Sequence, residues 1–214
     1  MPIVMAPAGD PLATGFVASF AKPGGNITGV SGFGTELSAK RIEVLREVLP
    51  ALKRIGLLTN GDDPFAKPFI AENRELADRL GLELHIVDVR RPEDTGPAYA
   101  EMKRRGVEAV VVQGVLSGPA WKAAQLALEY RLPALSFLGP FADSGGLIYY
   151  SQDTGDVYRR AASFVRRILA GAKPGDLPVE RPTQTELVIN LSTARQLGIT
   201  IPPSLRLRAD RVIR

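Results

Sequence analysis

The sequence contains no cysteine and only one histidine among its 214 residues. Without cysteine the chain can form no disulfide, no thiolate nucleophile and no cysteine-ligated metal site. His85 stands alone inside a strand-like run, so it cannot bring its own triad or metal cluster, and a structural or surface role is favoured. There is also no P-loop, no G-x-S-x-G and no H-E-x-x-H. We therefore predict no catalytic residue, no cofactor and no metal, and expect that the protein is not an enzyme.

Long apolar runs and concentrated charge are also lacking. No run approaches the roughly 18 residues that a membrane-spanning helix needs. The opening residues 1–6 are too short and lack the basic start of a signal peptide. The net charge of +4 is modest, and basic pairs such as Arg90-Arg91 are scattered without interleaved aromatic residues, so nucleic-acid binding is not favoured.

What the chain does contain is an alternation of strand and helix patterns, clearest over residues 54–89. An apolar run at 55–58 ends in the polar turn 59–64, and an amphipathic helix follows until Gly81 stops it before a second apolar run at 84–89. This order is typical of a parallel βαβ unit, and it recurs over residues 107–138. Right-handed crossovers place such strands side by side. We predict an α/β fold with an open parallel sheet, in which 55–59 lies beside 84–89.

The two ends of the chain carry weaker patterns. Residues 3–6 resemble a strand, and Asp10 with Pro11 is expected to begin a helix over 12–20. The glycine-rich stretch 24–34 is interpreted as a crossover between two lobes. Residues 151–155 are a second candidate crossover, and a helix over 156–170 and an extended stretch at 186–190 follow.

Candidate binding residues come from the loops that follow the predicted strands. Ligands of an open parallel sheet bind beyond the carboxyl ends of its strands, where such loops meet. The loops 60–65, 113–119 and 139–144 combine polar, aromatic and small residues but contain no nucleophile, and the helix starts after Pro64 and Pro119 offer N–H groups that suit a carboxylate. An ordinary loop role stays open for each residue, and acidic residues before a helix can simply cap it. The candidates in these loops are Asn60, Asp62, Asp63, Phe65, Gln113, Ser117 and Phe141.

Motifs near the C-terminal end resemble a known family. GDLPVE at 175–180, ELVIN at 186–190 and LGITIP at 197–202 are similar to those of the ABC-transporter substrate-binding proteins related to the periplasmic tryptophan- and tyrosine-binding proteins. The resemblance spans nearly the whole chain. It implies a type I periplasmic-binding fold, with two Rossmann-like lobes and a ligand cleft between them. It also implies a periplasmic protein that captures a small polar or amino-acid-like solute for a membrane permease, without chemistry.

The same resemblance implies roles for particular residues. Asp10 matches the family's first-lobe cleft aspartate, and residues 60–65 and 113–117 match two further cleft loops. Members that bind aromatic amino acids tend to have Asn-Ser in the first loop and Asp-Asn in the second. This chain instead has Asp63-Pro64-Phe65 and Gly114-Val115 there, so an aromatic amino acid is only one candidate ligand.

The family also carries a preceding segment with an export signal and most of the first lobe, so the chain is expected to be N-terminally truncated. We predict one complete parallel α/β lobe over 31–150, with 1–30 and 151–214 as the remnant of the other lobe. The apolar side of the 156–170 helix would then lack its partner at Phe164, Val165 and Ile168. We expect a homodimer through the incomplete lobe or lower stability there, and a poor affinity for the solute.

Two other functions remain open. The chain could be a Rossmann-like lobe of an enzyme, such as half of a nucleotide-sugar transferase, or the sensor core of a transcription regulator. The regulator lacks a preceding helix-turn-helix, and the enzyme needs a histidine or a carboxylate pair at the strand ends that capping does not explain. A ligand recovered unchanged from the protein would separate a binder from an enzyme.

Overall fold

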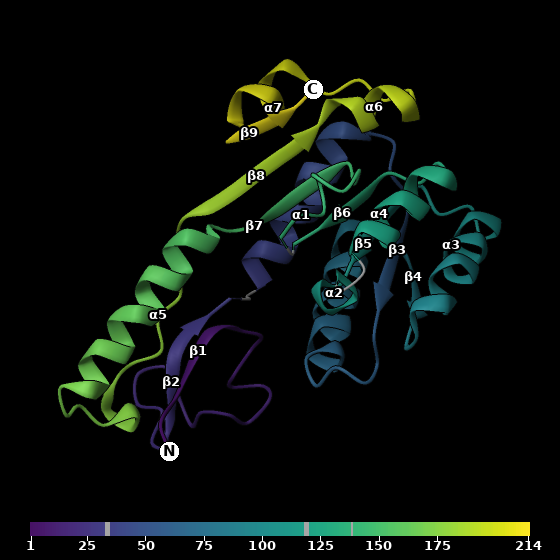
Figure 1. Cartoon of the computed structure of the whole chain (residues 1–214). Coiled ribbons are helices and arrows are strands. Elements are labelled where there is room, and N and C mark those ends of the chain that lie inside the picture. Colours follow the sequence, from purple (N-terminus) through teal and green to yellow (C-terminus); the bar gives the residue numbers. More distant parts are fainter. Residues whose placement is uncertain (33–34, 118–119, 138) are drawn as a thin grey trace. The chain divides into compact units, whose positions relative to one another are not determined.

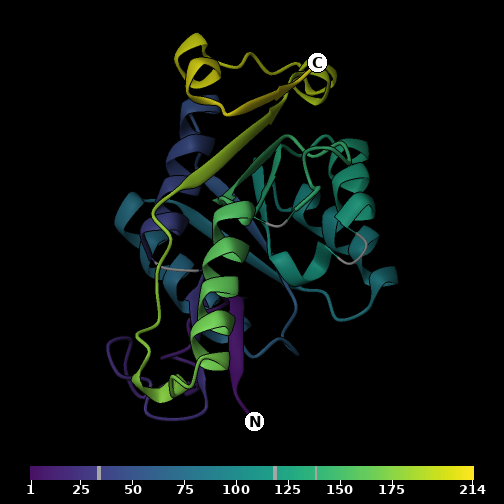
Figure 2. The same ribbon diagram turned by 60° about the vertical axis from the view of Figure 1, so that its left-hand side comes forward.

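The chain forms two compact units in a computed structural model that describes residues 1–32, 35–117, 120–137 and 139–214 (Figure 1; Figure 2). Unit 1 comprises Met1–Thr35 and Gln152–Thr185, and unit 2 comprises Glu36–Ser151 and Glu186–Arg214. The chain therefore passes between the units three times, after Thr35, Ser151 and Thr185. The third passage was not expected from the sequence.

Unit 2 is built on a seven-stranded sheet with the order β4-β3-β5-β6-β7-β8-β9. The pairs β3–β4, β3–β5, β5–β6, β6–β7 and β8–β9 are parallel. The predicted parallel α/β sheet is confirmed, as is the neighbouring position of the strands that begin near residues 55 and 84. The strands are β3 Arg54–Thr59, β4 Glu83–Asp88, β5 Ala109–Val112, β6 Ala134–Ser136, β7 Ile148–Gln152, β8 Thr185–Asn190 and β9 Arg211–Ile213.

Helices cover both faces of this sheet. Successive strand residues point to opposite faces, and Leu58, Val110 and Val112 face one core with α3 Thr95–Arg104 and α4 Ala120–Glu129. On the other face lie α1 Thr35–Val48 and α2 Ala66–Leu80, whose side chains meet Phe137 after β6. The predicted glycine stop holds, because Gly81 ends α2 at φ 65°, a backbone conformation that glycine adopts without strain.

The C-terminal segment differs from the sequence-based assignment, which grouped residues 151–214 with the smaller lobe. Residues 186–214 belong to unit 2 and supply β8, α6 Leu191–Leu197, α7 Pro203–Arg208 and β9. The physical reason is burial on both faces of β8, where Leu187, Val188 and Ile189 are each 3% exposed or less. Asn190 fixes the join, since its Nδ2 donates to the Ala142 carbonyl while its Oδ1 accepts from Thr193 N and caps α6.

Unit 1 is a small sheet with one long helix. β1 Ile3–Ala8 and β2 Ile27–Ser31 are parallel, and α5 Thr154–Leu169 packs against them through a core that includes Val30 and Phe164. Met5 and Val17 belong to a second, separate cluster of buried side chains in this unit. The segment 12–20, expected as a helix, forms turns instead.

The outer side of α5 carries an apolar stripe. Tyr158, Val165 and Leu169 are 58%, 45% and 83% exposed, and they recur at helical spacing. Phe164, which was expected to lack a partner, is only 1% exposed, so that part of the expectation was wrong. Val165 is exposed as expected, and Tyr158 and Leu169 rather than Phe164 accompany it on this surface.

Candidate functional site

The loop between β3 and α2 is shaped by its own polar side chains. Asn60 Oδ1 accepts a hydrogen bond from Asp62 N at 2.9 Å, and Asp63 Oδ1 accepts one from Phe65 N at 3.0 Å. Such side chain-to-backbone bonds two residues along hold tight turns. The helix begins only at Ala66, and no side chain caps it. Asn60 and Asp63 therefore shape the loop, and neither Asp62 nor Asp63 caps the helix, contrary to the simpler interpretation.

Gln113 joins this loop to the end of β5. It is 1% exposed, its Oε1 accepts from Asn60 N at 2.8 Å and its Nε2 donates to Asp63 Oδ2 at 2.7 Å. Three of the predicted residues, Asn60, Asp63 and Gln113, are thus brought together by direct hydrogen bonds. The carboxamide suits this position because it offers an acceptor and donors on one rigid plane.

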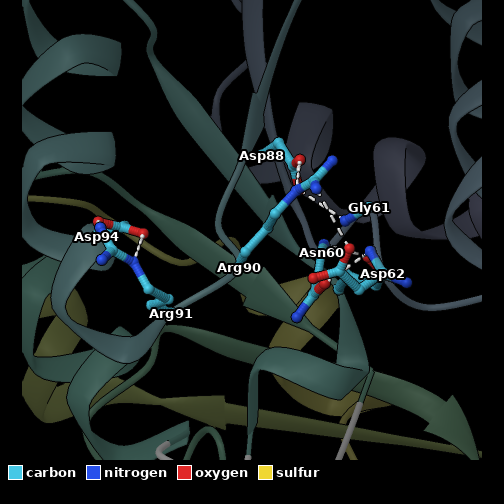
Figure 3. A network of polar contacts seen from close by, with 8 residues as sticks. Asn60, Gly61, Asp62, Asp88, Arg90, Arg91 and Asp94 are labelled. Atoms are coloured by element: carbon cyan, nitrogen blue, oxygen red, sulfur yellow. Dashed lines mark hydrogen bonds and ion pairs between the residues drawn. The ribbon is translucent and has the colours of Figure 1, made fainter.

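A charged cluster fixes the outer side of the same loop (Figure 3). Asp88, at the end of β4, accepts from Gly61 N at 2.6 Å and from Arg90 Nε at 2.8 Å, and Arg90 also lies 3.3 Å from the Asp62 carboxylate. Burial acts to raise the pKa of Asp88, but the hydrogen bonds from Arg90 and Gly61 outweigh it and the pKa is lowered. Asp62 is consequently tied to Arg90 through an exposed pair of the kind that contributes little to stability.

The remaining predicted residues have different surroundings. Phe65 is half-buried, with its ring 5.6 Å from that of Phe69. Ser117 ends the short 3-10 helix Gly114–Ser117, and its side chain lies outside the described part of the structure. Phe141 is fully buried in the core beside α3 and α4, so it does not line the rim as expected. Asp10, in unit 1, accepts from Leu12 N and Ala13 N and holds a turn.

A buried arginine in this region of unit 2 was not predicted from the sequence. Arg41 of α1 is 1% exposed, and its guanidinium carbon lies 4.2 Å from the centroid of the Phe137 ring. Burial lowers the pKa of Arg41 to about 10, although the charge of Glu72 opposes this effect, so the side chain stays cationic at neutral pH. A signal existed, since Arg41 falls in the apolar stripe of α1 with Leu45 and Val48 at i+4 and i+7.

Neither a metal centre nor a membrane segment emerges from the described ranges. No three histidine, aspartate or glutamate side chains there are grouped so that they could hold a metal ion. Within the same ranges no helix has both the length and the apolar character to span a bilayer. What the described residues offer is hydrogen-bonding groups at the strand ends, such as those of Asn60, Asp63 and Gln113.

Comparison with known families matches nearly the whole chain. The family model described as "ABC transporter substrate binding protein" covers residues 1–213. A curated tyrosine-binding protein from Clostridioides difficile is 25% identical over 201 residues, which is 93% of this chain and 57% of the relative. The chain thus spans little more than half the length of that relative.

Solved structures share the fold. An ABC domain from Streptococcus pneumoniae in complex with L-Trp has a TM-score of 0.90 and 28% identity, covering 99% of this chain and 72% of that one. A conserved domain protein from Vibrio cholerae has a TM-score of 0.90 and 25% identity, covering 99% and 71%. The ligand-free, open structure of a substrate binding protein from Clostridium difficile has a TM-score of 0.74 at 21% identity, covering 100% and 71%. These neighbours have the type I periplasmic-binding fold, as the sequence motifs implied.

Proposed function

The chain belongs to the ABC transporter substrate binding protein family, and on that premise we propose that it captures a small solute for an importer and leaves it chemically unchanged. The solute would be handed to a membrane permease, and the protein would work in the periplasm. The chain spans 57% of the curated relative and 72% of the Streptococcus pneumoniae structure, so both roles are proposals for this chain.

One observation supports this function above the others: the bridge that Gln113 makes between two strand-end loops. Its bonds to Asn60 N and Asp63 Oδ2 hold a polar rim at the carboxyl ends of β3 and β5, where open parallel sheets bind ligands. The rim is preorganised, which lowers the entropy cost of binding. Among the described residues of this rim no side chain is held as a nucleophile against a base.

An amino acid is the first solute to test. The relatives are a tyrosine-binding protein and a structure in complex with L-Trp. This chain differs from aromatic amino-acid binders at Asp63-Pro64-Phe65 and Gly114-Val115, so the side chain of its solute need not be aromatic. We propose that Asn60 contacts the solute and that Asp10 takes its ammonium or hydroxyl group. The N–H groups near Phe65, which the sequence offered to a carboxylate, are already used, since Phe65 N donates to Asp63 Oδ1 and Ala66 N to the Asp63 carbonyl.

The test is to identify the solute and then remove one contact at a time. Mass spectrometry of small molecules released from the purified protein should recover an unmodified solute, and calorimetry then measures its affinity. Asn60→Ala and Asp10→Ala should each weaken binding about tenfold or more, because a charged hydrogen bond in a desolvated site contributes roughly 1.5–3 kcal/mol. Asp94→Ala serves as the control, since Asp94 pairs with Arg91 outside these loops.

The outcomes separate the possibilities. Unchanged affinity in both variants would mean that the solute binds elsewhere. A solute that is recovered chemically altered would favour the enzyme alternative instead.

A further inference from the structure

Arg41 has a buried hydrogen-bond donor that the fold does not use. Its Nε donates to the Tyr150 carbonyl at 3.1 Å, and its guanidinium stacks on the Phe137 ring. Its Nη2 is inaccessible to solvent and has no hydrogen-bond partner among the described residues. Buried polar groups are almost always paired, and a buried charged donor without an acceptor is costly. The position therefore calls for an explanation other than stability.

The register of the strands places Arg41 at the carboxyl end of the sheet, where open parallel sheets bind ligands. Leu58 pairs with Val112, and Val112 pairs with Ser136. The next residue of each strand, Thr59, Gln113 and Phe137, therefore forms one row across three neighbouring strands, here called the strand-end row. Adjacent strands lie about 4.8 Å apart, so the row is about 10 Å wide. Arg41, seated on Phe137, lies over the same end of the sheet as the Gln113 bridge.

A second atom of the same row also lacks a partner. Thr59 is fully buried, and its Oγ1 has no hydrogen bond among the described residues. Thr59 and Phe137 lie on the α1/α2 face of the sheet by strand alternation, because Leu58 and Ala134 face the opposite core. A cationic donor and a hydroxyl thus remain unsatisfied at one end of one face.

We propose that Arg41 is the specificity-determining residue of the solute site and that it selects solutes carrying a carboxylate or another planar oxyanion. The inference rests on the proposed solute-binding function and names the solute class for it. The guanidinium Nη2 donates to the solute anion, while the Phe137 ring and the Tyr150 carbonyl hold its plane in place. An arginine suits this role because its planar fork matches an oxyanion and because a charge in the interior is weakly screened.

A purely structural role for Arg41 leads to expectations that differ from those of a role in solute selection. If the residue served only to tie α1 to β7, its replacement would lower stability and leave solute selectivity alone. If it serves the solute, its replacement should abolish the discrimination between an acid and its amide, in addition to any stability lost with the bond to the Tyr150 carbonyl and the contact with Phe137. The acid-to-amide ratio of affinities therefore separates the two explanations.

The experiment compares Arg41→Met with the control Lys40→Met. Both remove one positive charge from adjacent positions of α1, but Lys40 is exposed and pairs with Glu43. The probes are L-tryptophan with L-tryptophanamide and L-tyrosine with L-tyrosinamide, pairs that differ in the carboxylate but retain the ring and the ammonium group. Affinity is measured by calorimetry and the melting temperature by circular dichroism on the full chain.

We expect the native protein and Lys40→Met to bind an acid at least tenfold more tightly than its amide. Arg41→Met should lose this discrimination while it still unfolds in a cooperative thermal transition. An unchanged acid-to-amide ratio in Arg41→Met, or an amide that binds the native protein as well as the acid, would overturn the proposal.

Two further results would also overturn the proposal, and they separate it from the proposed function. Release of a neutral solute such as a sugar would end the anion assignment and leave solute binding intact. If the protein bound none of the probes and released no solute, both the anion assignment and the proposed solute-binding function would be refuted.

Discussion

Replacing Gln113 by leucine should destabilise unit 2, because this buried carboxamide joins two loops through its hydrogen bonds to Asn60 and Asp63. Leucine has a similar volume, so the cavity left behind is small and the lost hydrogen bonds dominate. The neutral bond to Asn60 N contributes about 0.5–1.5 kcal/mol, and the charge-assisted bond to Asp63 about 1.5–3 kcal/mol. Asp63 is half-buried and regains water when its partner is lost, so the second value should lie near its lower limit. We expect a total loss of about 2–3 kcal/mol.

The measurement is urea unfolding together with thermal melting. For a protein of this length 1 kcal/mol corresponds to about 2–4 °C, so the melting temperature of Gln113→Leu should fall by roughly 5–10 °C. Gln125→Leu is the matched control, since Gln125 is exposed on α4 and its replacement should change stability by less than about 0.5 kcal/mol.

A charge exchange tests the bridge itself. Gln113→Glu alone sets two carboxylates against each other and should be worse than leucine at neutral pH. Combined with Asp63→Asn it should recover most of the loss, because the position-63 amide can donate to the new carboxylate, which still accepts from Asn60 N. If the double variant were no more stable than Gln113→Glu, or if leucine were neutral, the bridge would not hold the loop.

Three other outcomes are expected. Asp143→Asn should lower the free energy of unfolding by about 0.2–1 kcal/mol at pH 7, since the half-exposed carboxylate pairs with Arg211, whose hydrogen bonds lower the pKa of Asp143. A carboxylate with a lowered pKa in the folded state stabilises the fold above its unfolded pKa, and this contribution is lost on protonation. The difference in stability between the native protein and the variant should therefore disappear as the pH falls below about 4. Leu169→Glu should convert a homodimer formed through the apolar stripe of α5 to monomers in light scattering, whereas a native protein that is monomeric with uniform hydrogen exchange in both units would refute that interface. Gly146→Ala should lower the free energy of unfolding, measured in urea, by about 1–3 kcal/mol or more, because an added Cβ would overlap the Phe141 ring. Gly96→Ala is the control: it has open space around it and should leave stability unchanged or slightly raised.

The central βαβ units could be predicted from sequence because local signals agree there. The run at 55–58, the amphipathic helix and the Gly81 stop each indicate the same element, and the structure has β3, α2 and the left-handed glycine in that order. Residues 12–20 failed for the converse reason: Asp10 and Pro11 are good helix starters, but the same aspartate can hold a turn, as its bonds to Leu12 N and Ala13 N do.

The candidate site was predictable only in part. Strand-end loops follow from the topology rule, and this found Asn60, Asp63 and Gln113. The rule does not say whether a loop side chain points to solvent or into the core, and Phe141 points into the core. Arg41 was missed because it lies on a helix and its ring contact, Phe137, is 96 positions along the chain, which no local pattern reveals.

The late position of β8 and β9 has a consequence for synthesis on the ribosome. A nascent chain that ends near residue 151 already contains the β4-β3-β5-β6-β7 part of the sheet, but β7 then has no neighbour on one side. A strand with an open edge can pair with strands of other chains, and translation adds only about 5–20 residues per second. The exposed edge of β7 therefore persists for seconds until residues 186–190 emerge to cover it, and this interval is when a chaperone would protect the chain from aggregation.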